Sequence, residues 1–271
     1  DQTLQNWLSK IDGDVVATPK MDGIAASLRY DDRGYLTVAA TRGSGLAGED
    51  ITANAHTIAD IPRKTKHAEI EVRGEIYLKL SVFARFGEQF SNPRNLAAGT
   101  LRRIKSSEVA QFPLTMFCYE GYFSDARLSH IEVLSRLKEL GFRVSDRIGV
   151  FSSRVSQEYV EGLDPEWTFG PLDDLPAYLK KGEEERRSLS YEIDGLVVKI
   201  DELDVRDELG YTGHHPRWAI AFKFESPEGS TVVTSIDVQV GRTGRVTPVA
   251  RVEPVHIGGS TIRNVTLHNQ D

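Results

Sequence analysis

Stretches in which apolar side chains recur at every second position constrain the fold of this chain more than any other feature. The two strongest are YEIDGLVVKI at 191–200 and RWAIAFKFE at 217–225, and residues 69–78 alternate as strictly. A strand sends successive side chains to opposite faces, so this period of two predicts sheets with one apolar and one polar face. Residues 23–42 read as two such strands joined by a short polar turn, which predicts an antiparallel pair.

Helical patterns lie between these strands. Apolar residues recur at helical spacing over four segments, about 51–58, 80–90, 95–105 and 129–140. The charged run KKGEEERR, within the polar residues 150–190, is typical of a solvated surface. From about residue 229 the pattern is strand-rich again and predicts a second, small all-β unit.

Composition excludes several classes of protein. With 271 residues, 39% hydrophobic and 27% charged residues, the chain is expected to be globular and soluble rather than disordered. No stretch reaches the eighteen or so apolar residues that a membrane helix needs, and the first residues show no secretory signal. The single cysteine, Cys118, excludes an internal disulfide and fits a reducing compartment.

A glycine-rich segment at 43–48 has the spacing G-x-G-x-x-G, follows a predicted strand and precedes a helical pattern. Such spacing is found where a dinucleotide meets a Rossmann fold, which would make the chain a dehydrogenase. The preceding strand, however, belongs to a hairpin rather than to a βαβ unit. A mobile surface loop is the alternative that the hairpin favours.

Three lysines lie at the ends of strand patterns. Lys20 stands in TPKMDG between two predicted strands, and Lys199 and Lys223 each end one. A lysine amine is a nucleophile only when neutral, and nearby cations or burial favour that form. Because Lys223 shares its face with the small residues Ala219 and Ala221, the sequence predicts a ligand pocket above this sheet.

Four carboxylates accompany the lysines. Asp22 is two residues from Lys20, Glu75 is on the polar face of its strand, and Glu192 and Asp194 share one face. Such a set can bind ribose hydroxyls or Mg²⁺. An ion pair of Glu192 and Asp194 with Arg186 or Arg187 is an equally favoured alternative.

Residues 92–105 form a basic stretch despite the net charge of −7. It holds Arg94, Arg102, Arg103 and Lys105 and no acidic side chain. Such a run is most often a solvated helix face, but it can also bind phosphate. A non-catalytic DNA-binding module is therefore a further hypothesis.

Seven motifs, in order along most of the chain, resemble those of bacterial NAD-dependent DNA ligases. They are PKMDG at 19–23, TRGSGLAGEDITAN at 41–54, VRGEIYL at 72–78, NPRNLAAGTLR at 92–102, YEIDGLVVKID at 191–201, PRWAIAFKF at 216–224 and GRTGRVTPVARVEPV at 241–255. The last segment, GGSTIRNVTLHN at 258–269, resembles the opening of that family's OB-fold domain.

The resemblance implies an α+β fold in two parts. An adenylation domain of the nucleotidyltransferase fold, with antiparallel sheets flanked by helices, would span residues 1–228. The N-terminal part of an OB-fold domain would span 229–271. The resemblance further implies NAD and Mg²⁺ as cofactors, nicked double-stranded DNA as partner, roles in DNA replication and repair, a monomeric state, no membrane, and a cytoplasmic location.

The resemblance also assigns roles to residues. Lys20, with Asp22 beside it, would be the catalytic nucleophile that takes AMP from NAD and releases NMN. The nucleotide would be bound by Thr18, Arg42, Glu75, Lys199, Lys223 and Arg186. Arg94 and Arg102, again with Arg186, would line the reactive phosphate or DNA side. The candidates for binding Mg²⁺ are Glu75, Glu192 and Asp194.

Two departures from the family pattern lead to further expectations. The family usually has a glutamate two residues before the nucleophile, facing the adenine amine, where this chain has Thr18. A hydroxyl accepts a hydrogen bond without the carboxylate's charge, so a divergent, weakly active paralogue is one alternative. Only 19 residues precede Lys20, where the family carries a helical domain that captures NMN, so the chain alone is expected not to complete ligation. A ligase or capping enzyme that uses ATP or GTP is the other alternative.

Overall fold

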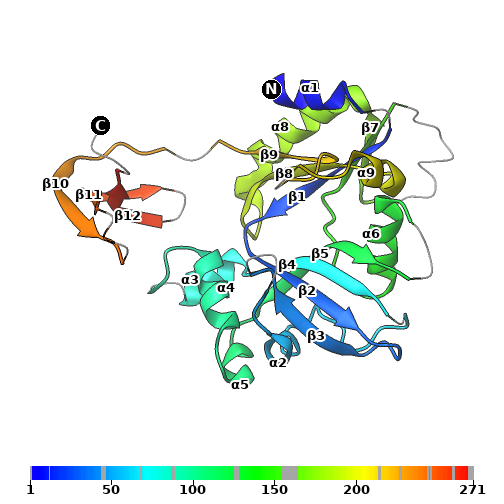
Figure 1. Ribbon diagram of the computed structural model, residues 1–271, viewed down its shortest axis with the longest axis horizontal. Helices are drawn as coiled ribbons and strands as arrows, with labels where there is room; N and C mark the ends of the chain where they lie inside the picture. Colours follow the sequence, from blue (N-terminus) through cyan, green and yellow to red (C-terminus); the bar gives the residue numbers. More distant parts are fainter. Residues whose placement is uncertain are drawn as a thin grey trace.

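Three β-sheets, two of them flanked by helices, make up the molecule (Figure 1). This computed structural model describes residues 2–11, 13–43, 47–67, 69–86, 89–124, 128–153, 164–212, 215–225, 228–242, 244, 246–257 and 260–267. Nearly all strand pairs are antiparallel, and the predicted α+β class is confirmed.

The first sheet has five strands in the order β7-β6-β1-β8-β9. They are β1 (Val15–Met21), β6 (Gly149–Ser152), β7 (Thr168–Pro171), β8 (Ile193–Ile200) and β9 (Ala219–Lys223). One face packs against α1 (Gln2–Leu8) and α8 (Leu175–Glu185), and its buried core includes Val15, Leu179 and Val198. Only β6 and β7 run parallel to each other.

The second sheet has four antiparallel strands in the order β3-β2-β4-β5. They are β2 (Ile24–Tyr30), β3 (Leu36–Thr41), β4 (Glu71–Tyr77) and β5 (Thr115–Tyr122). Four short helices belong to the same unit, α2 (Thr52–Ala55), α3 (Leu80–Phe86), α4 (Pro93–Leu101) and α5 (Ser106–Val109). Leu28, Val72 and Ile76 from the strands are fully buried with Leu96 of α4, so the apolar face of this sheet is its core.

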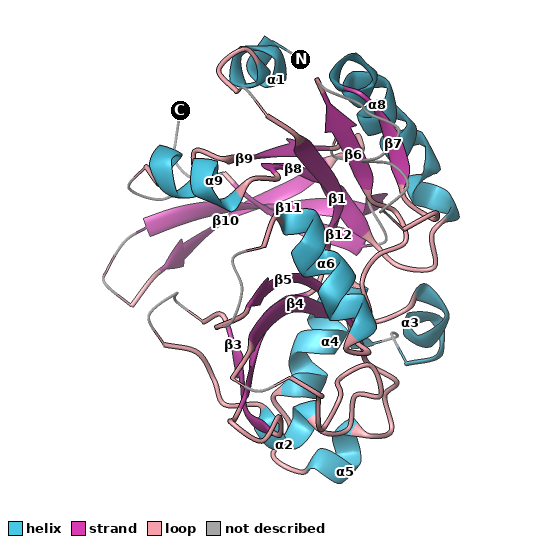
Figure 2. Cartoon of the chain, turned by 90° about the vertical axis from the view of Figure 1, so that its right-hand side faces the viewer, coloured by secondary structure: helices cyan, strands magenta, loops and turns pink. Residues whose placement is uncertain are grey.

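Helix α6 (His130–Glu139) lies between the two sheets (Figure 2). Ile131 and Leu134 pack with Val16 of the first sheet, while Val133 and Leu137 belong to the core of the second. Ser129 begins this helix with a capping box, in which its hydroxyl accepts from the Glu132 backbone N–H. Because α6 covers only part of that face of the first sheet, the rest of the face stays open toward the second sheet.

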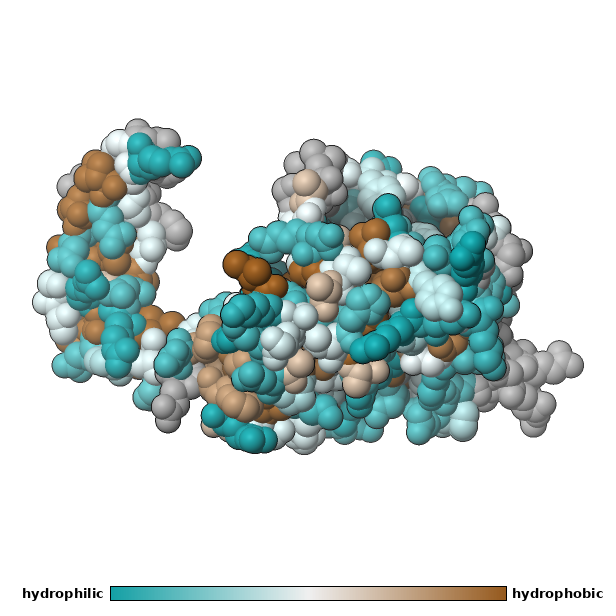
Figure 3. Space-filling model, turned by 90° about the horizontal axis from the view of Figure 1, so that it is seen from below, coloured by the Kyte–Doolittle hydropathy of each residue, from teal (hydrophilic) through white to brown (hydrophobic). Residues whose placement is uncertain are grey.

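The third sheet has three antiparallel strands, β10 (Val233–Val240), β11 (Val246–Ile257) and β12 (Ser260–Thr266). It stands apart from the other two in Figure 1, and Figure 3 shows apolar side chains gathered on it. Three alternate residues of β10, Ile236, Val238 and Val240, are all exposed. The predicted strand-rich unit after residue 229 is confirmed.

Some sequence predictions differ from the structure. Lys20 lies within β1 and not between two strands. The sequence did not reveal this strand, because the polar Thr18 and the proline beside it interrupt its apolar pattern. Most of the charged run KKGEEERR lies in α8, whose apolar residues face the first sheet. The helix expected over 51–58 is one turn, Thr52–Ala55.

The dinucleotide interpretation of the glycine-rich segment is wrong. The strand before it, β3, belongs to an antiparallel hairpin with β2 in an antiparallel sheet. A Rossmann site needs a parallel βαβ unit at this point. Residues 44–46, at the centre of the motif, lie outside the described residues.

Candidate active site

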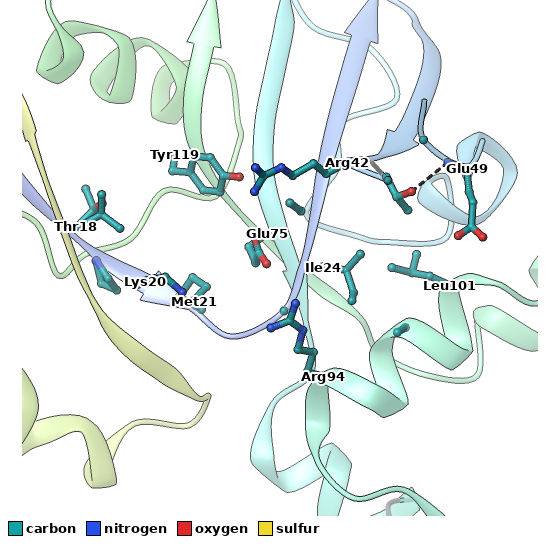
Figure 4. Close-up of a pocket in the computed structure, with 18 of the residues that line it drawn as sticks. Thr18, Lys20, Met21, Ile24, Arg42, Glu49, Glu75, Arg94, Leu101 and Tyr119 are labelled. Atoms are coloured by element: carbon teal, nitrogen blue, oxygen red, sulfur yellow. Dashed lines mark hydrogen bonds between the residues drawn. The ribbon is translucent and has the colours of Figure 1, made fainter. Parts of the chain in front are cut away.

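A cleft of about 990 Å³ lies between the first and second sheets. One wall carries Thr18 and Lys20 of β1 with Lys199 of β8, and the opposite wall includes Glu75 of β4 and residues of α4 (Figure 4). A volume of this size accommodates a nucleotide. The sequence predicted a pocket above Lys223, Ala219 and Ala221, but these residues are not in the cleft lining, and the cleft lies instead over Thr18, Lys20 and Lys199 of the same sheet.

Strand register brings the three lysines to one face of the first sheet. Lys20 pairs with Gly195, which pairs in turn with Lys223, and Lys199 lies four residues further along β8, on the same face and opposite Ala219. Directly paired residues of antiparallel strands point to the same face. Gly195 is required between the two lysines, because a Cβ there would lie 2.2 Å from the Phe222 carbonyl oxygen.

A β-bulge places Asp194 against Lys20. Lys20 pairs with Gly195 and the next residue, Met21, pairs with Ile193, so Asp194 has no cross-strand partner. Lys20 Nζ donates to both carboxylate oxygens of Asp194, at 2.7 and 2.6 Å. Bulges commonly redirect a side chain beside a functional site. The sequence pattern could not show this partner, because a bulge leaves no mark in the alternation of β8.

Glu75 lies deep in the cleft and carries an unusual charge state. Burial raises its pKa to about 7, although the positive charges of Arg94 and Lys20 act in the opposite direction. Figure 4 shows its carboxyl group between Lys20, Arg42 and Arg94. Glu75 can therefore be either a hydrogen-bond donor or an anion near neutral pH.

Tyr119, which sequence analysis missed, also faces the cleft (Figure 4). It is the unpaired residue of a second bulge, since Arg73 pairs with Glu120 and Gly74 with Cys118. The segment TMFCYEGY is too uniformly apolar at its start to reveal which side chains face outward. Its ring offers a flat surface on which a base can stack.

Three arginines, one after β3 and two from α4 and its end, line the cleft. Arg42 follows β3 and points toward Tyr119 in Figure 4. Arg94 of α4 pairs with Asp22 at 3.1 Å, and Arg102 at the end of α4 pairs with Glu49 at 3.0 Å. Asn92 is the N-cap of α4, and its side-chain oxygen accepts a hydrogen bond from the Asn95 backbone N–H. The basic stretch thus lies partly at the cleft and is not merely a solvated helix face.

Five predicted residues are not among those that line the cleft, namely Asp22, Lys223, Arg186, Glu192 and Asp194. Lys223 shares the face of Lys20 but is exposed. Arg186 donates to the Glu225 carbonyl oxygen and lies over the Phe224 ring. Burial, followed by the charge of Asp22, raises the pKa of Glu192.

The predicted alternative of ion pairs with Arg186 or Arg187 is wrong for Asp194, which pairs with Lys20 instead.

Among the described residues, no group of three or more His, Cys, Asp or Glu side chains is arranged to hold a metal ion. The candidates Glu75, Glu192 and Asp194 therefore do not form a closed all-protein site. A cation that keeps several waters and shares phosphate oxygens needs fewer protein ligands.

The two mainly antiparallel sheets with a lysine-bearing cleft between them define the class of the protein, the nucleotidyltransferase fold. Family models agree and are more specific. Residues 1–227 match the NAD-dependent DNA ligase adenylation domain, and residues 230–271 match the NAD-dependent DNA ligase OB-fold domain. The chain belongs to the NAD-dependent DNA ligase family.

Curated relatives support this membership. The chain is 46% identical over 269 residues to a DNA ligase of Magnetococcus marinus, a match that covers 94% of this chain and 33% of that protein. It is 42% identical to a DNA ligase of Marinomonas sp., a match that covers 100% of this chain and 40% of that protein. The chain thus spans between a third and two fifths of the length of these relatives.

A solved structure named Pmar-Lig_Pre. has a similar fold. It aligns with a TM-score of 0.51 at 11% sequence identity, over 97% of this chain and 53% of the other. In the described part of the chain, no helix is long and apolar enough to span a membrane.

Proposed function

We propose that this chain carries out the adenylation step of an NAD-dependent DNA ligase. The Lys20 amine attacks the α-phosphorus of the adenylate half of NAD, an N–P bond forms, the P–O bond to NMN breaks, and NMN leaves with the bridging oxygen. AMP then passes to the 5′-phosphate at a DNA nick, and the 3′-hydroxyl displaces it. The observation that carries the proposal is that Lys20 lines one cleft together with Lys199, Arg42 and Glu75.

The proton on Lys20 must leave before attack. Asp194, whose two oxygens accept from Lys20 Nζ, is the base in contact with this amine. In its observed contact it also fixes the direction of the amine, and phosphoryl transfer depends mainly on such positioning and on nearby cations. Asp194 is therefore proposed to orient Lys20 and to receive its proton.

The remaining residues are proposed to bind the nucleotide. Lys199 contacts the phosphate, because it lies on the face of Lys20 and lines the cleft. Glu75 binds ribose hydroxyls, and the Tyr119 ring stacks on the base. Thr18, which lines the cleft and is buried, offers its hydroxyl to the adenine edge. Arg42 adds a second cation near the phosphate.

Glu75, which lines the cleft, would hold a partly hydrated Mg²⁺, because hard oxygen ligands near phosphate are what this ion prefers. When bound, it would neutralise charge on the phosphate. Arg94 and Arg102, with Arg186 and the exposed Lys223, are proposed to contact the phosphate or DNA side. We further propose a domain boundary near residue 228.

Mass spectrometry of the intact protein tests the proposal. After incubation with NAD and Mg²⁺, we expect a mass increase of one AMP, reversed by adding NMN. Lys20→Ala should abolish the adduct, while Lys180→Ala, on the exposed side of α8, should leave it unchanged. An undiminished adduct in Lys20→Ala would place the nucleophile elsewhere. Adduct formation from ATP but not from NAD would favour the alternative nucleotide.

A further inference from the structure

Glu120 is a buried carboxylate that the proposed chemistry does not use. It lies on β5 of the second sheet and reaches across to Lys199 on β8 of the first. We propose that Glu120 is a positioning residue that keeps Lys199 charged and aimed into the cleft for the nucleotide phosphate. This inference rests on the proposed function for what Lys199 binds.

The contacts of Lys199 come almost entirely from β5. Its Nζ lies 3.3 Å from Glu120 Oε2 and 3.5 Å from the Tyr119 carbonyl oxygen, and 5.4 Å from the centre of the Tyr119 ring. Only 8% of Lys199 and 9% of Glu120 are exposed. An ammonium group buried to this extent needs a negative partner, and Glu120 is the one in contact with it.

The bulge on β5 explains how Glu120 reaches this position. Without it, Tyr119 and Glu120 would point to opposite faces of the sheet. With Tyr119 unpaired, Glu120 is the residue that pairs with Arg73, so both adjacent side chains face the first sheet. Tyr119 lines the cleft, and Glu120 contacts Lys199, which also lines it.

Glu120 also contacts charged or titratable side chains on two helices. His130 Nδ1 of α6 lies 3.4 Å from Oε1, and Arg206 Nη1 of α9 (Leu203–Leu209) lies 3.7 Å from Oε2. Burial lowers the pKa of His130 to about 4, so this ring is neutral at pH 7. Burial works against ionisation of Glu120, yet Lys199 and its other partners hold the Glu120 pKa below its ordinary value. One carboxylate therefore pairs with two buried cations.

Among the described residues, the other charged or titratable groups around this cluster are Arg73 of β4, Tyr119 and Tyr122 of β5, Asp201 after β8 and Tyr211 after α9. Burial already lowers the pKa of Lys199, and Glu120 opposes this effect. Removing the charge of Glu120 leaves Lys199 without its carboxylate partner and still facing Arg206. Because arginine does not deprotonate in proteins, Lys199 is the group that must lose its proton.

The direct test is the titration of Lys199, observed by NMR of ¹³Cε-labelled lysine and assigned with Lys199→Arg. In Glu120→Gln, we expect the pKa of Lys199 to fall by about 1 to 3 pH units relative to the wild type. Glu71→Gln is the matched control, because Glu71 lies on the same face of the second sheet and contacts Arg73, Ser27 and Arg29 but not Lys199. An unchanged pKa in folded Glu120→Gln, or an equal fall in Glu71→Gln, would overturn the proposal.

A graded variant covers the case in which Glu120→Gln does not fold. Glu120→Asp keeps the charge but moves it away by one methylene, so an intermediate fall in the pKa of Lys199 is expected. No fall in this variant would contradict the proposal. Circular dichroism melting identifies which variants are folded.

Adduct formation as a function of pH links the titration to chemistry. In Glu120→Gln, the alkaline limit of AMP transfer to Lys20 should move to lower pH by the same amount as the pKa of Lys199. A uniform loss at every pH would indicate a structural role only and would refute a positioning role. Absence of any adduct in the wild type would overturn the proposed function, whereas the NMR titration would still decide whether Glu120 keeps Lys199 charged.

Discussion

At the scale of single residues, the cleft holds side chains whose behaviour depends on neighbours from distant parts of the chain. Glu75 is the clearest case, because burial raises its pKa to about 7 even with Arg94 and Lys20 nearby. Burial of the ionised Glu75 carboxylate lowers the stability of the ligand-free protein, and a ligand hydroxyl or a cation beside it would offset this effect. Thr18, which lines the cleft and is buried, is the residue at which this chain departs from the family pattern.

Glu75 should make the stability of the protein depend on pH. Its pKa in the folded state, about 7, exceeds its ordinary value of 4.5. The folded protein therefore retains a proton that the unfolded chain releases, and stability falls as the pH rises from about 4.5 to 7. Between pH 5 and 8, urea unfolding should show the wild type losing roughly 2 to 3 kcal/mol more than Glu75→Gln. Identical pH dependence in both would contradict this, and Glu139→Gln is the surface control.

Thr18→Val should weaken nucleotide binding without unfolding the protein. Valine matches the volume of threonine but lacks the hydroxyl proposed to meet adenine. The loss of one hydrogen bond is worth about 0.5 to 1.5 kcal/mol, so calorimetry should show AMP affinity reduced about 2- to 10-fold. Thr37→Val, on the exposed side of β3, is the control. Unchanged AMP affinity would remove Thr18 from the binding site.

At the scale of elements, two β-bulges shape the site. One is on β8 at Asp194 and the other on β5 at Tyr119. Each inserts one unpaired residue into its strand; the first brings Asp194 to Lys20 on the neighbouring strand, and the second turns Tyr119 toward the cleft. The ion pair of Lys20 with Asp194 is therefore a property of the strand pairing and not of either residue alone.

Asp194→Asn tests the contact between Asp194 and Lys20 that the bulge on β8 makes possible. The amide keeps the shape of the side chain but removes its negative charge and its ability to take a proton from Lys20. Both side chains of the ion pair are partly exposed, so the free energy of unfolding should change by no more than about 1 kcal/mol. Formation of the AMP adduct should slow by about 10²-fold or more. Equal rates in Asp194→Asn and in the surface control Asp173→Asn would show that Asp194 is dispensable.

At the scale of the whole molecule, the chain consists of a two-sheet body that holds the cleft and a three-stranded sheet beside it. In the described ranges, β10, β11 and β12 pair only with one another. The described residues that line the cleft, by contrast, all fall within the range from Thr18 to Lys199. The proposed nucleotide site therefore belongs to the two-sheet body.

A chain ending at residue 228 should keep the fold of this body. We expect its melting temperature to stay within a few degrees of that of the full sequence, since no strand of the body loses a partner. Adduct formation at Lys20 should persist. Thermal unfolding and intact-mass analysis check both expectations. Loss of the cooperative transition would show that the third sheet is required for the body to fold.

The period-two strands, the helix at 129–140 and the lysines of the site could be predicted from the residues, because they depend on local spacing and residue type. The ordered motifs also led to the ligase family. Three contacts became visible only in the folded molecule: Asp194 with Lys20, Tyr119 with the cleft, and Glu120 with Lys199. Each of these contacts depends on how strands far apart in the chain are paired, and the one-residue shift of a bulge is invisible in a pattern of alternating side chains.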